Sequence, residues 1–174
     1  MSALEIRPLS LEPATVAALG ELLVETVANG GSVSFMHPLS REDAEAFWTK
    51  SLGSPGRVVL GAYAGGELAG AVTLSLDLPP NQPHRGEIAK MMTALRFRGR
   101  GVGSALLAEA ERLARARGRT LLNLDTASED GAGAFYERNG YTFAGEIPDF
   151  ALKPHGGLTA TRIYWKRIGP ASCL

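Results

Sequence analysis

Residues 98–104 read Arg-Gly-Arg-Gly-Val-Gly-Ser, a turn rich in glycine and arginine. It lies between a β-rich run, residues 85–93, and a run with apolar residues at helical spacing, residues 102–117. Glycine lets a backbone approach a ligand closely, and a helix N-terminus presents unpaired N–H groups at the positive end of its dipole. Because neighbouring arginines add positive charge, we expect this turn to bind a diphosphate. A solvated glycine-rich turn is the simpler alternative.

The segments around this turn alternate between strand-like and helix-like patterns. We predict strands at residues 4–9, 57–64, 67–76, 85–93, 120–125, 141–144 and 159–166. We predict helices at residues 12–28, from residue 40 through Trp48, at 102–117 and at 130–138. The order βααβββαβαββ predicts an α/β fold in which one mixed sheet carries helices on both faces.

Length and charge exclude several classes of protein. The 174 residues suit a single domain, residues 1–174, and 18 basic residues balance 18 acidic ones. We therefore expect no nucleic-acid and no membrane partner. No signal peptide or membrane-spanning run is visible, so the expected location is cytoplasmic. The single cysteine, Cys173, permits no internal disulfide and makes a covalent acyl-cysteine route improbable.

Two ligand classes fit the glycine-rich turn. A dinucleotide would need G-x-G-x-x-G, but Ser104 stands at the last position, although Asp125 does end the next predicted strand. No second strand-helix-strand unit follows, and no Gly-Lys-Ser/Thr marks a nucleoside triphosphate loop. Coenzyme A is the second class.

Two motifs resemble the GNAT acetyltransferase superfamily. Arg98-x-x-Gly101-x-Gly103 is similar to its (Q/R)-x-x-G-x-(G/A) signature, and residues 134–141, Ala-Phe-Tyr-Glu-Arg-Asn-Gly-Tyr, resemble its F-Y-E-x-x-G-(F/Y) segment. The resemblance implies a GNAT-like, mostly antiparallel sheet of about seven strands. It also implies direct transfer of an acetyl group from acetyl-CoA to the primary amine of a small molecule.

A narrower resemblance, to tabtoxin-resistance-type acetyltransferases, rests on residues 87–92, 145–152 and 164–167. It implies an amino acid-like metabolite or an amine-bearing toxin as acceptor. Homodimers are common among such proteins. The other interpretations are a dinucleotide-binding oxidoreductase and a CoA-binding regulatory domain without catalysis.

The chemistry requires a base, because an alkylamine with a pKa of about 10.4 is protonated near neutral pH. Glu87, on the strand before the turn, is the candidate. The resemblance puts the base of glutamate-using relatives at this place, while others use a chain of water molecules. A plain ion pair of Glu87 with Arg85 or Lys90 is the structural alternative, and His84 is a second candidate base.

The departing thiolate needs a proton, and the resemblance places Tyr136 beside the sulfur as its donor. A core aromatic packed on Phe135 is the alternative. The resemblance further implies a bulge in the preceding strand, and a slot where that strand separates from the next. The residues implied in cofactor binding are Met91, Met92 and Thr93 through their main chain, then Arg98, Gly99, Arg100, Gly101, Val102, Gly103, Ser104 and Phe135.

Acceptor specificity is expected from the loop between the first two helices and from the C-terminal loop. The candidate wall residues are Phe35, Met36, Trp48, Asp77 and Asp149, of which either aspartate could attract an ammonium group. The three histidines, His37, His84 and His155, lack metal-ligand spacing, so we expect no metal.

Overall fold

The computed structural model describes residues 4–170, so Cys173 lies outside the described part. Its centre is one seven-stranded sheet in the order β1-β2-β3-β4-β5-β7-β6. The strands are β1 (Leu4–Pro8), β2 (Arg57–Ala64), β3 (Glu67–Ser75), β4 (Arg85–Thr93), β5 (Leu121–Ala127), β6 (Thr142–Leu152) and β7 (Leu158–Arg167). Only the β4–β5 pair is parallel, which confirms the mixed, mostly antiparallel sheet.

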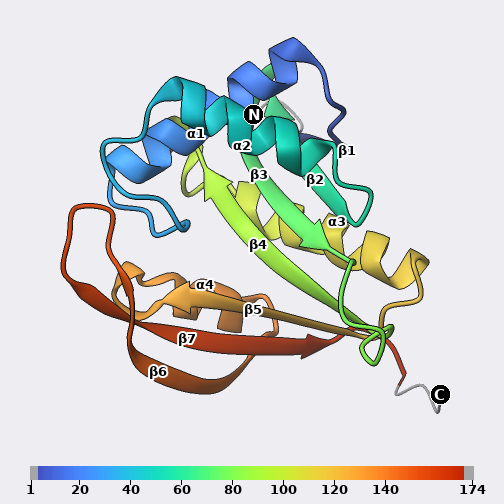
Figure 1. Ribbon diagram of the computed structural model, residues 1–174. Coiled ribbons are helices and arrows are strands. Elements are labelled where there is room, and N and C mark those ends of the chain that lie inside the picture. Colours follow the sequence, from blue (N-terminus) through green and yellow to red (C-terminus); the bar gives the residue numbers. More distant parts are fainter. Residues whose placement is uncertain (1–3, 171–174) are drawn as a thin grey trace.

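Four α-helices cover the two faces of the sheet (Figure 1). They are α1 (Pro13–Ala28), α2 (Arg41–Leu52), α3 (Val102–Ala116) and α4 (Ala132–Arg138), with short 3₁₀ turns at Leu95–Phe97 and Ser128–Asp130. The α1–α2 pair packs over β2, β3 and β4, and α3 packs across β1 to β4. The predicted element order is confirmed. No helix within residues 4–170 is long and apolar enough to cross a membrane.

Local sequence explains the first two helices. Leu19, Leu23 and Val27 recur every four residues on α1 and are fully buried. The α2 helix begins after Ser40, whose Oγ accepts a hydrogen bond from the Asp43 backbone N–H at 3.0 Å, as the capping pattern predicts. The apolar face of α2 then packs onto the sheet.

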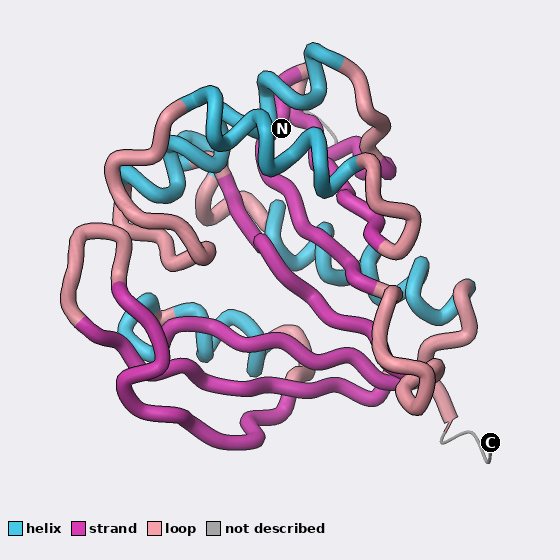
Figure 2. The backbone as a smooth tube through the Cα atoms, viewed as in Figure 1, coloured by secondary structure: helices cyan, strands magenta, loops and turns pink. Residues whose placement is uncertain are grey.

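The sheet opens between β4 and β5. Only Arg85–Glu87 pairs with Leu121–Asn123, although β4 continues to Thr93 and β5 to Ala127. Beyond that point the strands diverge, as the two ribbons and the tube show (Figures 1 and 2). The β4 strand contains a bulge: Ala89 and Met92 are three residues apart, but their partners on β3, Thr73 and Ala71, are only two residues apart. The expected bulge and separation are therefore both present, and they create the space for the site.

The C-terminal hairpin is longer than predicted. The sequence indicates a strand only at 141–144, but β6 runs from Thr142 to Leu152. Gly145 and Pro148 interrupt the strand pattern, and the β6–β7 register shifts near both. Proline is tolerated here because β6 is an edge strand, where one row of backbone N–H groups needs no partner.

Candidate functional site

A cavity of about 500 Å³, here named the α3 cavity, lies at the N-terminus of α3. Gly99 (φ 72°) and Gly101 (φ 78°) both adopt the left-handed conformation that glycine favours. Gly101 is the N-cap of α3 and supplies no side-chain cap, so the first-turn N–H groups point outward without a partner in the helix. The cavity is lined by Met91, Thr93, Phe97, Arg98, Gly99, residues 101–104, Ala132, Phe135 and Arg138.

This cavity fits the diphosphate part of coenzyme A. Two arginines, Arg98 and Arg138, lie in its wall together with the amides of the helix start. Among the described residues, no heavy atom lies within 4 Å of where a Cβ on Gly99 or Gly101 would stand. A Cβ on Gly103 would instead meet the Phe135 ring at 2.9 Å, so that glycine permits close packing of α3 on α4.

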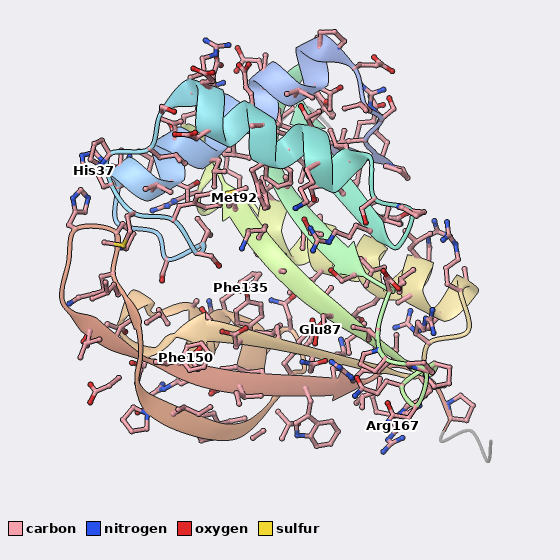
Figure 3. All side chains as sticks on the ribbon, in the orientation of Figure 1. His37, Glu87, Met92, Phe135, Phe150 and Arg167 are labelled. Carbon is pink, nitrogen blue, oxygen red and sulfur yellow. The ribbon has the colours of Figure 1, made fainter. Side chains whose placement is uncertain are left out.

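Most predicted cofactor residues line the α3 cavity, and two do not. The Met92 side chain is buried in the core (Figure 3), but the contact expected of Met92 is through its main chain and stays a prediction. Arg100 does not line the cavity, and its guanidinium carbon lies 5.5 Å from the centroid of the Phe97 ring. Arg138 also lines the cavity but is not predicted from the sequence, because it stands at an unspecified (x) position of the F-Y-E-x-x-G-(F/Y) segment.

A second cavity, of about 230 Å³, occupies the opening between β4 and β5. We name it the β4–β5 cavity. It is lined by residues 32–34 of the α1–α2 loop, 88–91, 125–127, Tyr136, 150–152 and 159–161. A cavity of this volume suits a small molecule or the end of a chain. The two loops at its mouth touch, because the His37 N–H donates to the Pro154 carbonyl at 2.8 Å.

The two cavities meet at α4 and at the bulge. Met91 lines both of them, and the adjacent residues Phe135 and Tyr136 line one each. Figure 3 shows Phe135 in the opening between the diverging strands. A group held in the α3 cavity therefore has a short path to Tyr136. Since the bulge residues Lys90 and Met91 have no register partner on β3, their backbone groups are free to bind such a group.

Tyr136 is both a core aromatic and a lining residue. Its ring packs against Phe135, Tyr141 and Tyr164, with centroid distances of 5.1, 5.9 and 5.9 Å, and the residue is only 6% exposed. Burial raises the pKa of its hydroxyl above the ordinary 10.0, and the negative charge of Asp125 raises that pKa further. The phenol is thus protonated throughout the neutral range.

Glu87 stands where β4 and β5 begin to separate (Figure 3). Arg85 Nη1 donates to its Oε1 at 2.6 Å, and its side chain is 42% exposed. The ion pair with Arg85 that the sequence left open is therefore formed. Glu87 does not line either cavity, but it pairs with Asn123, two residues before Asp125, so its side chain shares a sheet face with Asp125.

Lys90 and Asp125 are the charged residues in the wall of the β4–β5 cavity. The Lys90 ammonium donates to Ser34 Oγ at 2.9 Å and lies 6.0 and 5.8 Å from the ring centroids of Phe35 and Phe47. Burial lowers its pKa from the ordinary 10.5, which Asp125 partly opposes. Thr161 Oγ1 donates to the Asp125 carboxylate at 2.9 Å.

None of the predicted wall residues lines the β4–β5 cavity directly. The prediction of Trp48 as a wall residue is wrong, because its side chain points from α2 into the core and is 0% exposed. Phe35 contributes indirectly, packed on Phe47 behind Lys90. Asp77 packs against Gly56 at the far end of β3 and lies outside the cavity, and the exposed Met36 does not line it. Asp149 precedes the lining residue Phe150 without lining the cavity itself.

Neither Ser34 nor Thr161 is predicted from the sequence, Lys90 is considered there only as an ion-pair partner of Glu87, and Asp125 only as part of a dinucleotide motif. No spacing in the chain relates residues 34, 90, 125 and 161.

The candidate base His84 lies just before β4, outside the cavity, and its backbone carbonyl accepts the Thr120 N–H at 2.8 Å. Among the described residues, no group of three or more His, Cys, Asp or Glu side chains is arranged to hold a metal.

Solved structures share this architecture. The N-acetyltransferase from Staphylococcus aureus Mu50 has a TM-score of 0.82 at 17% identity, over 97% of this chain and 100% of that chain. The yncA protein from Salmonella typhimurium, solved with its cofactor acetyl-CoA, has a TM-score of 0.81 at 18% identity, over 99% and 98%. The ribosomal-protein-alanine N-acetyltransferase from Brucella melitensis has a TM-score of 0.79 at 23% identity, over 94% and 99%. At these identities the likeness concerns the fold.

A family model shows the family. The model for the acetyltransferase (GNAT) family matches residues 24–141, which include α3, both cavities' shared residue Met91 and the α4 tyrosine. This match replaces the dinucleotide-binding oxidoreductase as an interpretation of the glycine-rich turn. Residues 24–141 make up more than half of the chain, so the chain belongs to the acetyltransferase (GNAT) family, whose co-substrate is acetyl-CoA.

Proposed function

We propose that this protein transfers the acetyl group of acetyl-CoA directly to the primary amine of a small molecule held in the β4–β5 cavity. The observation that carries the proposal is the junction of the two cavities: Met91 lines both, and Phe135 and Tyr136 line one each. Acetyl-CoA supplies an activated acyl group as a thioester. The α3 cavity has the glycines, arginines and free amides that its diphosphate requires.

The residues divide the proton transfers between them. The amine nitrogen forms a bond to the carbonyl carbon, the C–S bond breaks, and the thiolate receives a proton from Tyr136 Oη. The protonated amine loses its first proton to a base, for which we propose Glu87, acting through water at the start of the opening. It loses a second proton to solvent once the N–C bond has formed. The proton that Tyr136 gives up is then replaced from solvent. A backbone N–H of the bulge at Lys90 and Met91 polarises the carbonyl.

Two measurements test this function. Calorimetry should give binding of acetyl-CoA and none of NADH. Thiol release from acetyl-CoA, followed over a panel of small amines, should rise with at least one acceptor, and mass spectrometry of the product should show one added acetyl group. Binding of NADH instead, or binding of acetyl-CoA without acetylation of any small amine, contradicts the proposal. The second result would favour the non-catalytic CoA-binding alternative.

Glu87→Gln is expected to lower the rate near neutral pH by about 10²-fold, because the amide accepts no proton from the amine. The measurement is kcat/KM between pH 6 and 10 with the best amine of the panel. Arg85→Gln is the matched control, because it breaks the same 2.6 Å ion pair but leaves the carboxylate. If both variants lose the same activity, the pair is structural and Glu87 is not the base.

A further inference from the structure

Three non-glycine residues of the described chain have left-handed backbone conformations; two of them line the β4–β5 cavity, and the third is adjacent in sequence to a lining residue. They are Ser34 (φ 73°), Lys90 (φ 51°) and Asp149 (φ 51°). Ser34 and Lys90 line the cavity and bond to each other, and Asp149 precedes the lining residue Phe150. Such conformations cost about 1–3 kcal/mol each and persist where surrounding structure holds them, typically at functional sites.

Resting on the proposed function, we propose that Lys90 and Ser34 form an anion-binding subsite, and that the acceptor is a small zwitterion. Its anionic group binds to the Lys90 ammonium and the Ser34 hydroxyl. Its ammonium group binds to Asp125 before it loses a proton. The substrate class is therefore an amine with a carboxylate, or a similar anion, close to the nitrogen that receives the acetyl group.

The surroundings of Lys90 leave room for an anion. An ammonium group has three N–H donors, and Ser34 takes one of them. Phe35 and Phe47, which do not line the cavity, offer the ammonium ring faces, and these accept no conventional hydrogen bond. Because burial has removed part of the water around this cation, a ligand anion would restore the interactions that it lost.

Lys90 is not already neutralised by a carboxylate. Within residues 4–170, no ion pair joins Lys90 to Asp125 or to any other acidic group, whereas the nearby Arg85, Lys153 and Arg162 each have an acidic partner. The two opposite charges thus face one cavity of about 230 Å³ without contacting each other. This is the arrangement that a ligand with one charge of each sign would complete.

Thr161 prepares the other end of the subsite. Its hydroxyl donates to Asp125 Oδ2 at 2.9 Å and so orients the carboxylate, leaving Oδ1 for a ligand. Asp125 and Tyr136 both line the β4–β5 cavity, and the negative charge of Asp125 adds to the rise in the pKa of the phenol that burial causes. An ammonium group bound to Asp125 would therefore lie near the proton donor, while Lys90 holds the anion toward the α1–α2 loop.

The test compares three versions of each acceptor: an amino acid, its amide, and the amine that lacks the carboxyl group. Each of the proteinogenic amino acids is assayed with its two analogues by thiol release. For at least one side chain, we expect the acid to exceed the amide in kcat/KM by roughly 10–100-fold, the range of a lost charge-assisted hydrogen bond. Binding of the acid to the protein saturated with coenzyme A, measured by calorimetry, should show the same preference.

Lys90→Met keeps the length of the side chain and removes the charge. It should raise KM for the acid by roughly 10–100-fold and bring the acid-to-amide ratio close to one, whereas Lys90→Arg should retain part of the preference. Lys50→Met, an exposed position on α2 away from the cavity, is the matched control and should keep the full ratio. Acetyl-CoA binding by each variant reports that it is folded.

The possible failures are distinguishable. If amines are acetylated but no acid exceeds its amide, or if Lys90→Met keeps the wild-type ratio, the zwitterion inference is wrong and the acetyltransferase function stands. If acetyl-CoA binds and no small amine is acetylated at all, the proposed function itself fails.

Discussion

Tyr136→Phe should lower kcat by about 10²–10⁴-fold and leave the affinity for acetyl-CoA close to that of the wild type. The ring packs against three other aromatic rings and survives the change, so the fold is preserved. Only the hydroxyl is lost, and Tyr136 lines the β4–β5 cavity, where we propose that the thiolate is protonated. Steady-state kinetics, with calorimetry for acetyl-CoA, measure the two effects separately.

The pH dependence has a definite sign. Because burial raises the pKa of Tyr136 above 10.0, its proton is retained through the neutral and mildly alkaline range. The wild-type kcat should therefore show no loss from ionisation of Tyr136 up to about pH 10. Tyr141→Phe is the matched control, since Tyr141 packs on Tyr136 but lines neither cavity. Equal losses in both variants would mean that the aromatic cluster, and not the Tyr136 hydroxyl, sets the rate.

Gly101→Val should reduce the affinity for acetyl-CoA by more than about 100-fold. The residue has a φ of 78° at the start of α3, and a β-branched residue is a genuine outlier in that conformation. The added side chain would also project into the open space of the α3 cavity, where the diphosphate must approach the backbone amides. Calorimetric titration with acetyl-CoA measures the loss.

Gly118→Val separates strain from obstruction. Gly118 has almost the same φ, 73°, and is equally open, but it lies at the other end of α3. Both variants should lose a similar 1–2 kcal/mol of stability, measured by urea unfolding. Only Gly101→Val should lose acetyl-CoA. If Gly118→Val weakens binding as much, the α3 turn contributes through stability alone and its role as a cradle is refuted.

Much of the fold could be predicted because its signals are local. Hydrophobic spacing locates α1 and α3, the Ser40 cap starts α2, and the Gly65-Gly66 pair connects β2 to β3. Where local signals conflict, the prediction falls short: β6 crosses Gly145 and Pro148, which the edge position tolerates. Trp48 shows the reverse error, because a large aromatic near a loop suits a pocket wall as well as a core.

The sequence alone indicated most of the turn that lines the α3 cavity, from Arg98 to Ser104 without Arg100, because these residues are consecutive in the chain. Tertiary structure alone decided the acceptor half. The bulge at Lys90 and the early end of the β4–β5 pairing bring Ser34, Lys90 and Asp125 to one cavity. The spacing of these residues along the chain does not predict that they line one cavity. Their proximity depends on strand register and on where β4 and β5 separate, and both are set by packing across the whole sheet.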